Sequence, residues 1–307
     1  MAQSSSILHP VARSEENPQS EHKRHDFPRT SRLLFGTAGV PRSLSGGSHL
    51  EGVHEVGRLG LKAMELAFVH QVNIRLDDAP RLRAAADERG ICLSVHAPYY
   101  INLNSRDKRV VAASRQRILR SARVGWLCGA RHIVFHAAWR HDDAATQVYE
   151  TVRTQLLELS DVLGEEGTDV WLCPETTGRA AQFGDLDELL MLAQDVPRTK
   201  PCVDFAHLHA RAGMSNSEPE FEAILDATEA ALGLDALQDM HIHVSGISYG
   251  VYGETRHLPL GESDFRYREL LRVLERRSVT GRVICESPAN DADAVLLSAQ
   301  WREICGC

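Results

Sequence analysis

The feature that most constrains the fold is a regular alternation of short β-like runs with amphipathic helical stretches, which begins at Leu33 and continues almost to the C-terminus. Strands are expected at 33–38, 61–68, 91–97, 131–137, 169–175, 200–206, 240–246 and 281–287. Several of the helical stretches between them end in Gly, as helices often do. Strands that alternate with helices predict parallel βα units. Eight such units predict a (β/α)₈ TIM barrel, a fold of about 250 residues.

The composition fits one large globular domain, because 43% of the 307 residues are hydrophobic and 25% are charged. We expect a TIM-barrel catalytic domain over residues 32–307. Residues 1–31 are rich in Ser, Pro, Glu and His and lack apolar periodicity, which predicts a disordered N-terminal tail. The sequence contains no apolar run of the ~20 residues that a membrane helix needs and no apolar segment typical of a secretory signal. A cytoplasmic protein without a membrane partner is expected.

Charge and cysteine content argue against a passive DNA-binding protein and against a structural zinc site made of cysteines. The formal net charge of −8 argues against a passive DNA binder that relies on a broad basic surface. It does not exclude a nuclease, because bound divalent ions supply positive charge where the phosphate must lie. The seven cysteines lie singly, without the paired spacing of structural zinc sites. We therefore expect Cys173 and Cys202 to be reduced core residues.

Catalytic residues of a TIM barrel come from the C-terminal ends of its strands. Six consecutive predicted strands end in an imidazole or a carboxylate, and these residues are His96, His136, Glu175, Asp204 (with His207 just beyond), His243 and Glu286. So many carboxylates and imidazoles in one mouth would perturb one another's pKa values strongly unless cations held them together. The pattern therefore predicts a cluster of divalent metal ions. Imidazole and carboxylate without thiolate suit Zn²⁺, Mn²⁺ or Fe.

At the level of motifs, the chain resembles endonuclease IV, the metal-dependent apurinic/apyrimidinic endonuclease of the xylose-isomerase-like TIM barrel superfamily. The runs that carry the resemblance are SVHAPYYINL (94–103), IVFHAAW (133–139), CPETTG (173–178), CVDFAHLHARAG (202–213), HVSGISYGVYGETRHLPLGE (243–262) and ICESPAN (284–290). The resemblance spans about residues 33 to 305, and the spacing Asp204-x-x-His207 is specific.

The resemblance implies three zinc ions at the barrel mouth, with Mn²⁺ as an alternative metal. The first ion would be bound by His96, His136 and Glu175. The second would share Glu175 as a bridge and would add Asp204, His243 and Glu286. The third would be bound by His207, His257 and a carboxylate that the family places two residues before the second histidine. That position is Thr255 here, and Glu254 precedes it, so we expect Glu254 to replace the usual Asp.

The same resemblance implies the activity. A zinc-bound hydroxide, oriented by Glu175, would hydrolyse the phosphodiester bond 5′ to an abasic site in double-stranded DNA. Tyr99 matches a tyrosine that the family places against the lesion, and His70 stands where an arginine that enters the DNA is expected. We expect the chain to act as a monomer.

Two alternatives remain at this stage. A sugar isomerase or epimerase of the same superfamily uses the same barrel and a related site of His, Asp and Glu, but it usually needs fewer ions. A catalytically silent DNA- or metal-binding barrel is the second alternative, and the Thr255 departure is its main support. The pair His207 and His257 exceeds what one or two ions require, which favours the nuclease.

Overall fold

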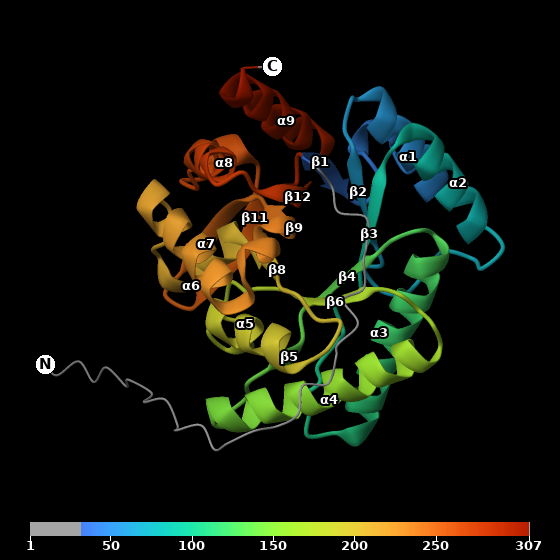
Figure 1. The fold of residues 1–307 in the computed structure, drawn as a ribbon, viewed down its shortest axis with the longest axis vertical. Helices are drawn as coiled ribbons and strands as arrows, with labels where there is room; N and C mark the ends of the chain where they lie inside the picture. The colour runs from blue at the N-terminus through green and yellow to red at the C-terminus, as the bar shows by residue number, and fades with distance from the viewer. Residues whose placement is uncertain (1–31, 307) are drawn as a thin grey trace, which may run out of the picture.

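The computed structural model describes residues 32–306, so the predicted tail 1–31 lies outside the described residues. Eight parallel strands form the central sheet: β1 (Leu33–Ala38), β2 (Ala63–Ala67), β3 (Cys92–His96), β4 (His132–Phe135), β6 (Trp171–Pro174), β8 (Cys202–Asp204), β9 (Gln238–Val244) and β12 (Thr280–Cys285). Each overlaps one of the eight runs expected from the sequence. The predicted TIM barrel is confirmed (Figure 1).

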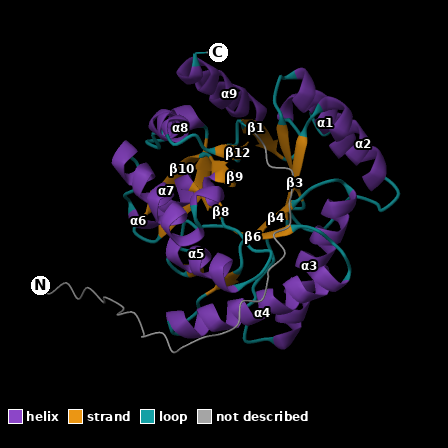
Figure 2. Cartoon of the chain, in the orientation of Figure 1, coloured by secondary structure: helices purple, strands orange, loops and turns teal. Residues whose placement is uncertain are grey.

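The strands follow the order β6-β4-β3-β2-β1-β12-β9-β8, which brings β6 and β8 to the two edges of the sheet. Two isolated parallel bridges, Leu172 to Thr199 and Glu175 to Cys202, join these edges. The barrel is therefore nearly closed, and Figure 2 shows the strands ringed by helices. We call the line between β6 and β8 the seam.

Helices surround the sheet: α1 (His49–Arg58), α2 (Ala79–Arg89), α3 (Lys108–Leu127), α4 (Ala145–Glu165), α5 (Leu186–Asp195), α6 (Phe205–Ala212), α7 (Glu218–Leu232), α8 (Tyr267–Arg276) and α9 (Asp291–Cys305). Local sequence sets several of their ends. A capping box of Ser48 and Glu51 begins α1, and Gly90 ends α2 in the left-handed conformation. None of the described helices is both long and apolar enough to span a membrane.

Apolar residues of the strands form two separate layers. Most of them, for example Leu66, Val95 and Ile242, belong to the large core cluster that also includes the buried faces of the helices. Smaller clusters contain the alternate strand residues, among them Val134, Cys173 and Cys202. This alternation follows from the period of two along a strand. Both cysteines are buried and free, as the sequence predicted for core residues.

Two short antiparallel pairs, absent from the sequence-based prediction, lie in the loops. The strands β10 (Gly246–Gly250) and β11 (Gly253–Leu258) form a hairpin directly after β9. The strands β5 (Ala138–Trp139) and β7 (Gln182–Phe183) join the loop after β4 to the loop after β6. Both pairs extend from the ends of barrel strands that carry candidate ligands. They therefore fix the loops around the mouth.

Candidate metal centre

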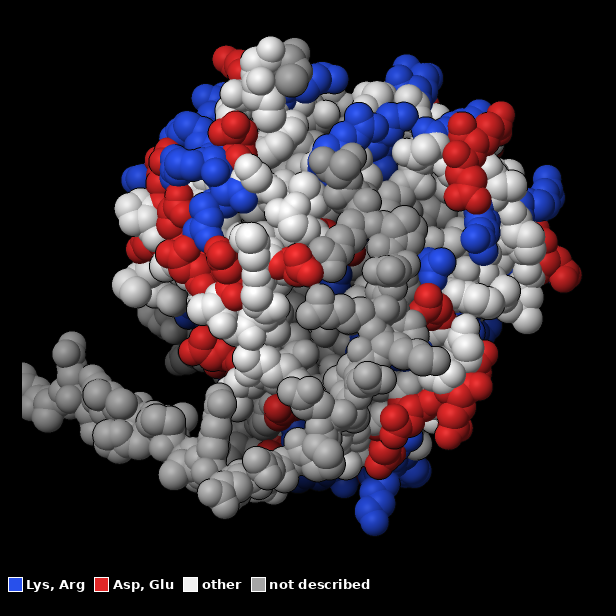
Figure 3. Space-filling model, in the orientation of Figure 1, with Lys and Arg blue, Asp and Glu red and all other residues white. Residues whose placement is uncertain are grey.

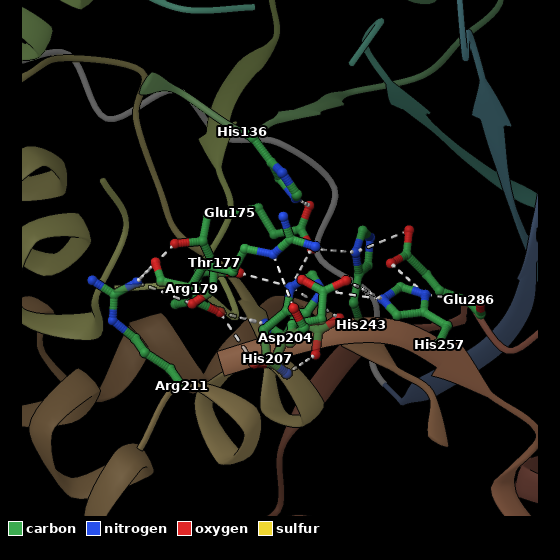
Figure 4. A network of polar contacts seen from close by, with 12 residues as sticks. His136, Glu175, Thr177, Arg179, Asp204, His207, Arg211, His243, His257 and Glu286 are labelled. Carbon is green, nitrogen blue, oxygen red and sulfur yellow. Dashed lines mark hydrogen bonds and ion pairs between the residues drawn. The ribbon is translucent and has the colours of Figure 1, made fainter. Parts of the chain in front are cut away.

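The structure brings the predicted ligands together in three overlapping groups at the mouth. Ligand atoms within each group lie within 4.8 Å of one another, and the groups are His96, His136 and Glu175; Glu175, Asp204, His243 and Glu286; and Asp204, His207 and His257. The first two groups match the division that the resemblance implied. In the third, Asp204 joins the two histidines, a role that the sequence did not suggest. Figure 4 labels most of these side chains, for example His136, Glu175 and His257, and shows that they converge on one region.

Glu175 lies at the centre of this region and is buried. One carboxylate oxygen lies 3.2 Å from His96 Nε2 and 3.1 Å from His136 Nε2. The other lies 3.2 Å from His207 Nδ1 and 3.3 Å from His243 Nδ1. Burial alone would raise the pKa of Glu175, but the neighbouring imidazoles outweigh it and hold the pKa well below its ordinary value. Glu175 is thus an ionised carboxylate whose two oxygens face different histidines.

Asp204 provides a test of whether a metal fits the site. It ends β8 and caps α6, where its Oδ1 accepts a hydrogen bond of 2.7 Å from the backbone N–H of His207. Its Oδ2 is buried and accepts no hydrogen bond from the described residues. Burial and the charges of Glu175 and Glu286 raise the pKa of this carboxyl. A buried carboxylate oxygen without a donor is costly, and a divalent ion at this position would remove that cost.

Glu286 follows β12 and faces the same space. Its Oε1 lies 3.4 Å from His243 Nδ1. Burial would raise the pKa of Glu286, but the positive charge of His243 prevails and lowers the pKa to about 2. The second group therefore offers three carboxylates and one imidazole, a donor set that suits Zn²⁺ or Mn²⁺.

The third group depends on an irregularity in the hairpin. The Nε2 atoms of His207 and His257 face each other at 3.1 Å. In β11 the pairing shifts so that Tyr249 is opposite Glu254 while the adjacent Ser248 is opposite Arg256, which leaves Thr255 as an extra residue. Such a β-bulge reverses the alternation of side chains.

The bulge brings Glu254 to the face of β11 that carries His257. Glu254 Oε2 lies 3.5 Å from His207 Nε2, and Oε1 lies 3.8 Å from His257 Nε2. Thr255 instead donates a hydrogen bond of 2.8 Å to the backbone carbonyl of Ser248. Glu254 stands one residue before the position at which the resemblance implies a carboxylate. Its carboxylate nevertheless lies beside the third group.

The two residues predicted to contact DNA lie in different surroundings. Tyr99 is 58% exposed, and its ring centroid is 5.4 Å from that of His96. It lines two cavities of about 530 and 350 Å³ that open at the mouth. His70 is exposed, stacks on Tyr100 with ring centroids 5.9 Å apart, and lines neither cavity. Both DNA contacts remain predictions.

One important residue was missed by the sequence analysis. Glu65, within β2, is fully buried in the barrel interior and lines the larger mouth cavity. Its Oε2 accepts hydrogen bonds from Ser94 Oγ at 2.9 Å and from His241 Nε2 at 3.0 Å, and its Oε1 lies 3.1 Å from His243 Nε2. The available signal was a glutamate in the middle of the apolar run LKAMELAF.

Glu65 determines which nitrogen His243 presents to the centre. With Nε2 beside Glu65, the ring turns Nδ1 toward Glu175 and Glu286. His96 has the opposite arrangement, because its Nδ1 lies 2.8 Å from the carbonyl of Ala97 and its Nε2 faces Glu175. A partner on the outer nitrogen of a ligand histidine fixes its tautomer and orientation.

The fold and these groups define a class of protein: a TIM barrel with clusters of His, Asp and Glu side chains that could bind metal ions at the C-terminal ends of its strands. The chain belongs to the xylose isomerase-like TIM barrel family, whose model matches residues 53–304.

Two relatives and two solved structures illustrate the range of similar proteins. An uncharacterized protein of Methanocaldococcus jannaschii is 42% identical over 89% of this chain and 98% of its own length. A probable endonuclease 4 of Mycoplasma pneumoniae is 25% identical over 64% of this chain and 68% of its own length. Two solved structures share the fold. Endonuclease IV from Thermus thermophilus has a TM-score of 0.67 and 21% identity, and the match covers 89% of this chain and 99% of that chain. A D-tagatose 3-epimerase-like protein has a TM-score of 0.68 and 17% identity, and the match covers 88% of this chain and 97% of that chain.

Proposed function

We propose that this chain is a DNA repair endonuclease of the endonuclease IV type, which hydrolyses the phosphodiester bond 5′ to abasic sites in double-stranded DNA. It would act as a monomer with three Zn²⁺ ions, or with Mn²⁺ in their place. The similarity to a probable endonuclease 4 supports this proposal, as do the motifs that resemble the endonuclease IV family.

The observation that carries the proposal is the number of donors around Glu175. Four imidazoles lie within 3.3 Å of its carboxylate oxygens. The three ligand groups share Glu175 and Asp204, so their ions would lie side by side. Clustered divalent ions suit phosphodiester hydrolysis, because they stabilise both the attacking and the leaving oxygen.

The residues of this chain would have distinct tasks. The ions, when bound, supply a water of lowered pKa and positive charge for the phosphate. Glu175 would hold the ions through both carboxylate oxygens, which face different histidines, and would help to orient the nucleophile. Tyr99, exposed beside His96, would pack against the nucleotide at the lesion. An abasic nucleotide lacks base stacking and is easily flipped into the mouth.

A sugar epimerase is the second candidate, and a specific observation supports it. The group Glu175, Asp204, His243 and Glu286 could complete one ion by itself, and a barrel with one ion would resemble the epimerases that share this fold. His136 and His257 would then have no ligand role, although both belong to ligand groups at the mouth. The additional donors favour the nuclease.

The test combines metal analysis with two activity assays on the full chain. The protein is loaded with Zn²⁺, its metal content is measured by elemental analysis, and it is incubated with a labelled duplex that contains one abasic site. An undamaged duplex is the substrate control and Glu175→Gln the enzyme control. Epimerisation of ketohexoses is assayed in parallel. We expect three ions per chain and a single cut 5′ to the lesion that leaves a 3′-hydroxyl.

Two results would refute the proposal. Fully loaded protein that leaves the abasic duplex intact is not this nuclease, and if it also leaves ketohexoses unchanged, the catalytically silent barrel is the better description. One ion per chain together with epimerisation would identify the sugar enzyme instead.

A further inference from the structure

We propose that Arg179 forms an anion subsite beside the metal centre and binds a non-bridging oxygen of the substrate phosphate. The inference deepens the proposed function, on which it rests, by naming a residue that recognises the phosphate itself. Arg179 lies in the loop between β6 and β7, four residues after Glu175. It lines the 350 Å³ cavity with residues of all three ligand groups, including His136, His207 and Glu286.

The guanidinium of Arg179 is oriented by the protein backbone and not by a carboxylate. Its Nε donates a hydrogen bond of 2.9 Å to the backbone carbonyl of Glu254. The side-chain carboxylate of Glu254 faces His207 and His257 instead. Within residues 32–306, Arg179 forms no ion pair. Its terminal N–H groups are therefore not occupied by a carboxylate of the described residues, and Figure 4 shows the side chain among the residues of the centre.

Many arginines of this chain are in a different situation. On the outer surface, Arg272 and Arg276 of α8 pair with Glu218 of α7, and Figure 3 shows basic and acidic side chains interleaved on the face in view. Such exposed pairs neutralise each other and contribute little to stability. A partly buried guanidinium that faces a cavity and forms no ion pair with the described residues suits a ligand that is negatively charged.

The loop that carries Arg179 is held firmly. Gly253 has φ +91°, and a Cβ on it would lie 2.1 Å from the carbonyl oxygen of Gly178. A Cβ on Gly178 would lie 2.5 Å from Glu254 Cβ. The hairpin and the loop after β6 therefore approach each other through two glycines. Arg211 adds a hydrogen bond of 2.5 Å to the carbonyl of Arg179. The position of the guanidinium is thus fixed before any ligand arrives.

Charge balance at the mouth identifies the ligand as an anion. Five carboxylates lie at or directly beneath the centre, and they belong to Glu65, Glu175, Asp204, Glu254 and Glu286. Three divalent ions would carry more positive charge than these carboxylates carry negative charge, and Arg179 adds to the excess. A phosphodiester would reduce that excess, whereas a neutral sugar would not. The planar guanidinium also matches the geometry of phosphate oxygens.

The test uses Arg179→Gln and Arg179→Lys, with Arg153→Gln on the outer helix α4 as the matched control for loss of one positive charge. Zinc content is measured for every variant. Inorganic phosphate is then titrated into the zinc-loaded proteins by calorimetry, which requires no DNA. We expect the three variants to retain zinc. Phosphate affinity should fall about ten- to hundredfold in Arg179→Gln, as for loss of a charged hydrogen bond, should be partly restored in Arg179→Lys, and should be unchanged in Arg153→Gln.

Incision kinetics supply an independent readout. In the abasic duplex assay, Arg179→Gln should raise KM or lower kcat, while Arg153→Gln should match the parent. Unchanged phosphate affinity in Arg179→Gln would overturn the subsite. Loss of zinc in both Arg179 variants would also overturn it, because the residue would then serve the metal centre and not the anion. If phosphate binding depends on Arg179 but the parent does not cut abasic DNA, the subsite stands and the proposed nuclease activity fails.

Discussion

Glu65→Gln tests how the barrel interior controls the metal centre. Glutamine keeps the size of the side chain but removes the charge that Glu65 directs at His241 and His243. These contacts, of 3.0 and 3.1 Å, are fully buried, so water cannot replace them. The amide also has a donor that would compete with an imidazole N–H. We therefore expect His243 to lose its fixed tautomer.

The expected magnitude follows from the place of Glu65 beneath one ligand group. Loss of a partner to a ligand histidine typically costs 10- to 100-fold in metal affinity, or about 1.4–2.7 kcal/mol. Complete burial argues for the upper end of that range. Glu175, Asp204 and Glu286 remain, so the ion in their group should still bind at saturating zinc. The other two ions should keep affinities close to those of the parent.

The measurement is a zinc titration against a chromophoric chelator that resolves the three binding steps. Nitrogen-15 NMR of the histidine side chains reports the His243 tautomer in the loaded protein. Ser94→Ala is the matched control, because it removes only the hydrogen bond from Ser94 to Glu65 and should weaken zinc binding less than tenfold. The reasoning fails if Glu65→Gln binds all three ions as the parent does, or if it weakens every ion equally.

Three further predictions concern the ligands themselves. Glu175→Gln should preserve the circular dichroism spectrum and reduce incision of abasic DNA by orders of magnitude; a variant that cuts at the parent rate would remove its bridging role. Glu254→Ala should reduce the metal content from three ions to two, and unchanged content would exclude Glu254 as a ligand. Zinc loading at pH 7 should release protons. Burial alone would lower the pKa of all three imidazoles, but Glu175 raises the pKa of His96 to about 9, and neighbouring groups, carboxylates among them, raise the pKa of His207 and of His243. These three imidazoles therefore carry protons at pH 7 in the metal-free protein, zinc must displace those protons, and affinity should rise with pH up to about 9. A pH indicator in weak buffer measures the release, and its absence would contradict these protonation states.

The barrel and the candidate ligands at its strand ends could be predicted from the sequence for a simple physical reason. Strands that are buried on both faces appear as continuous apolar runs, and a polar residue at the end of such a run is conspicuous. Parallel strands in one barrel then place all of these ends at the same mouth. The strand positions and the meeting of His96, His136 and Glu175 required no more information than this.

Features that depend on contacts between distant segments could not be predicted in the same way. The importance of Glu65 arises from β2 and β9 facing each other across the barrel interior, and no local pattern reports that contact. The position of Glu254 depends on the bulge at Thr255, which is set by pairing with β10. In the sequence Arg179 is not distinguishable from other loop arginines. Its place beside the centre depends on the packing of the hairpin against Gly178.

Because the candidate ligands lie on both sides of the seam between β6 and β8, a bound metal would also affect the stability of the barrel. The two edges are joined at the seam by two isolated bridges, whereas the other neighbouring strands pair as ladders. Glu175 stands at the end of one edge and Asp204 at the end of the other. An ion bound by both would cross-link the two edges at the seam. Without metal, the barrel would open first along this line, so metal supply would govern how long the folded chain survives as well as whether it is active.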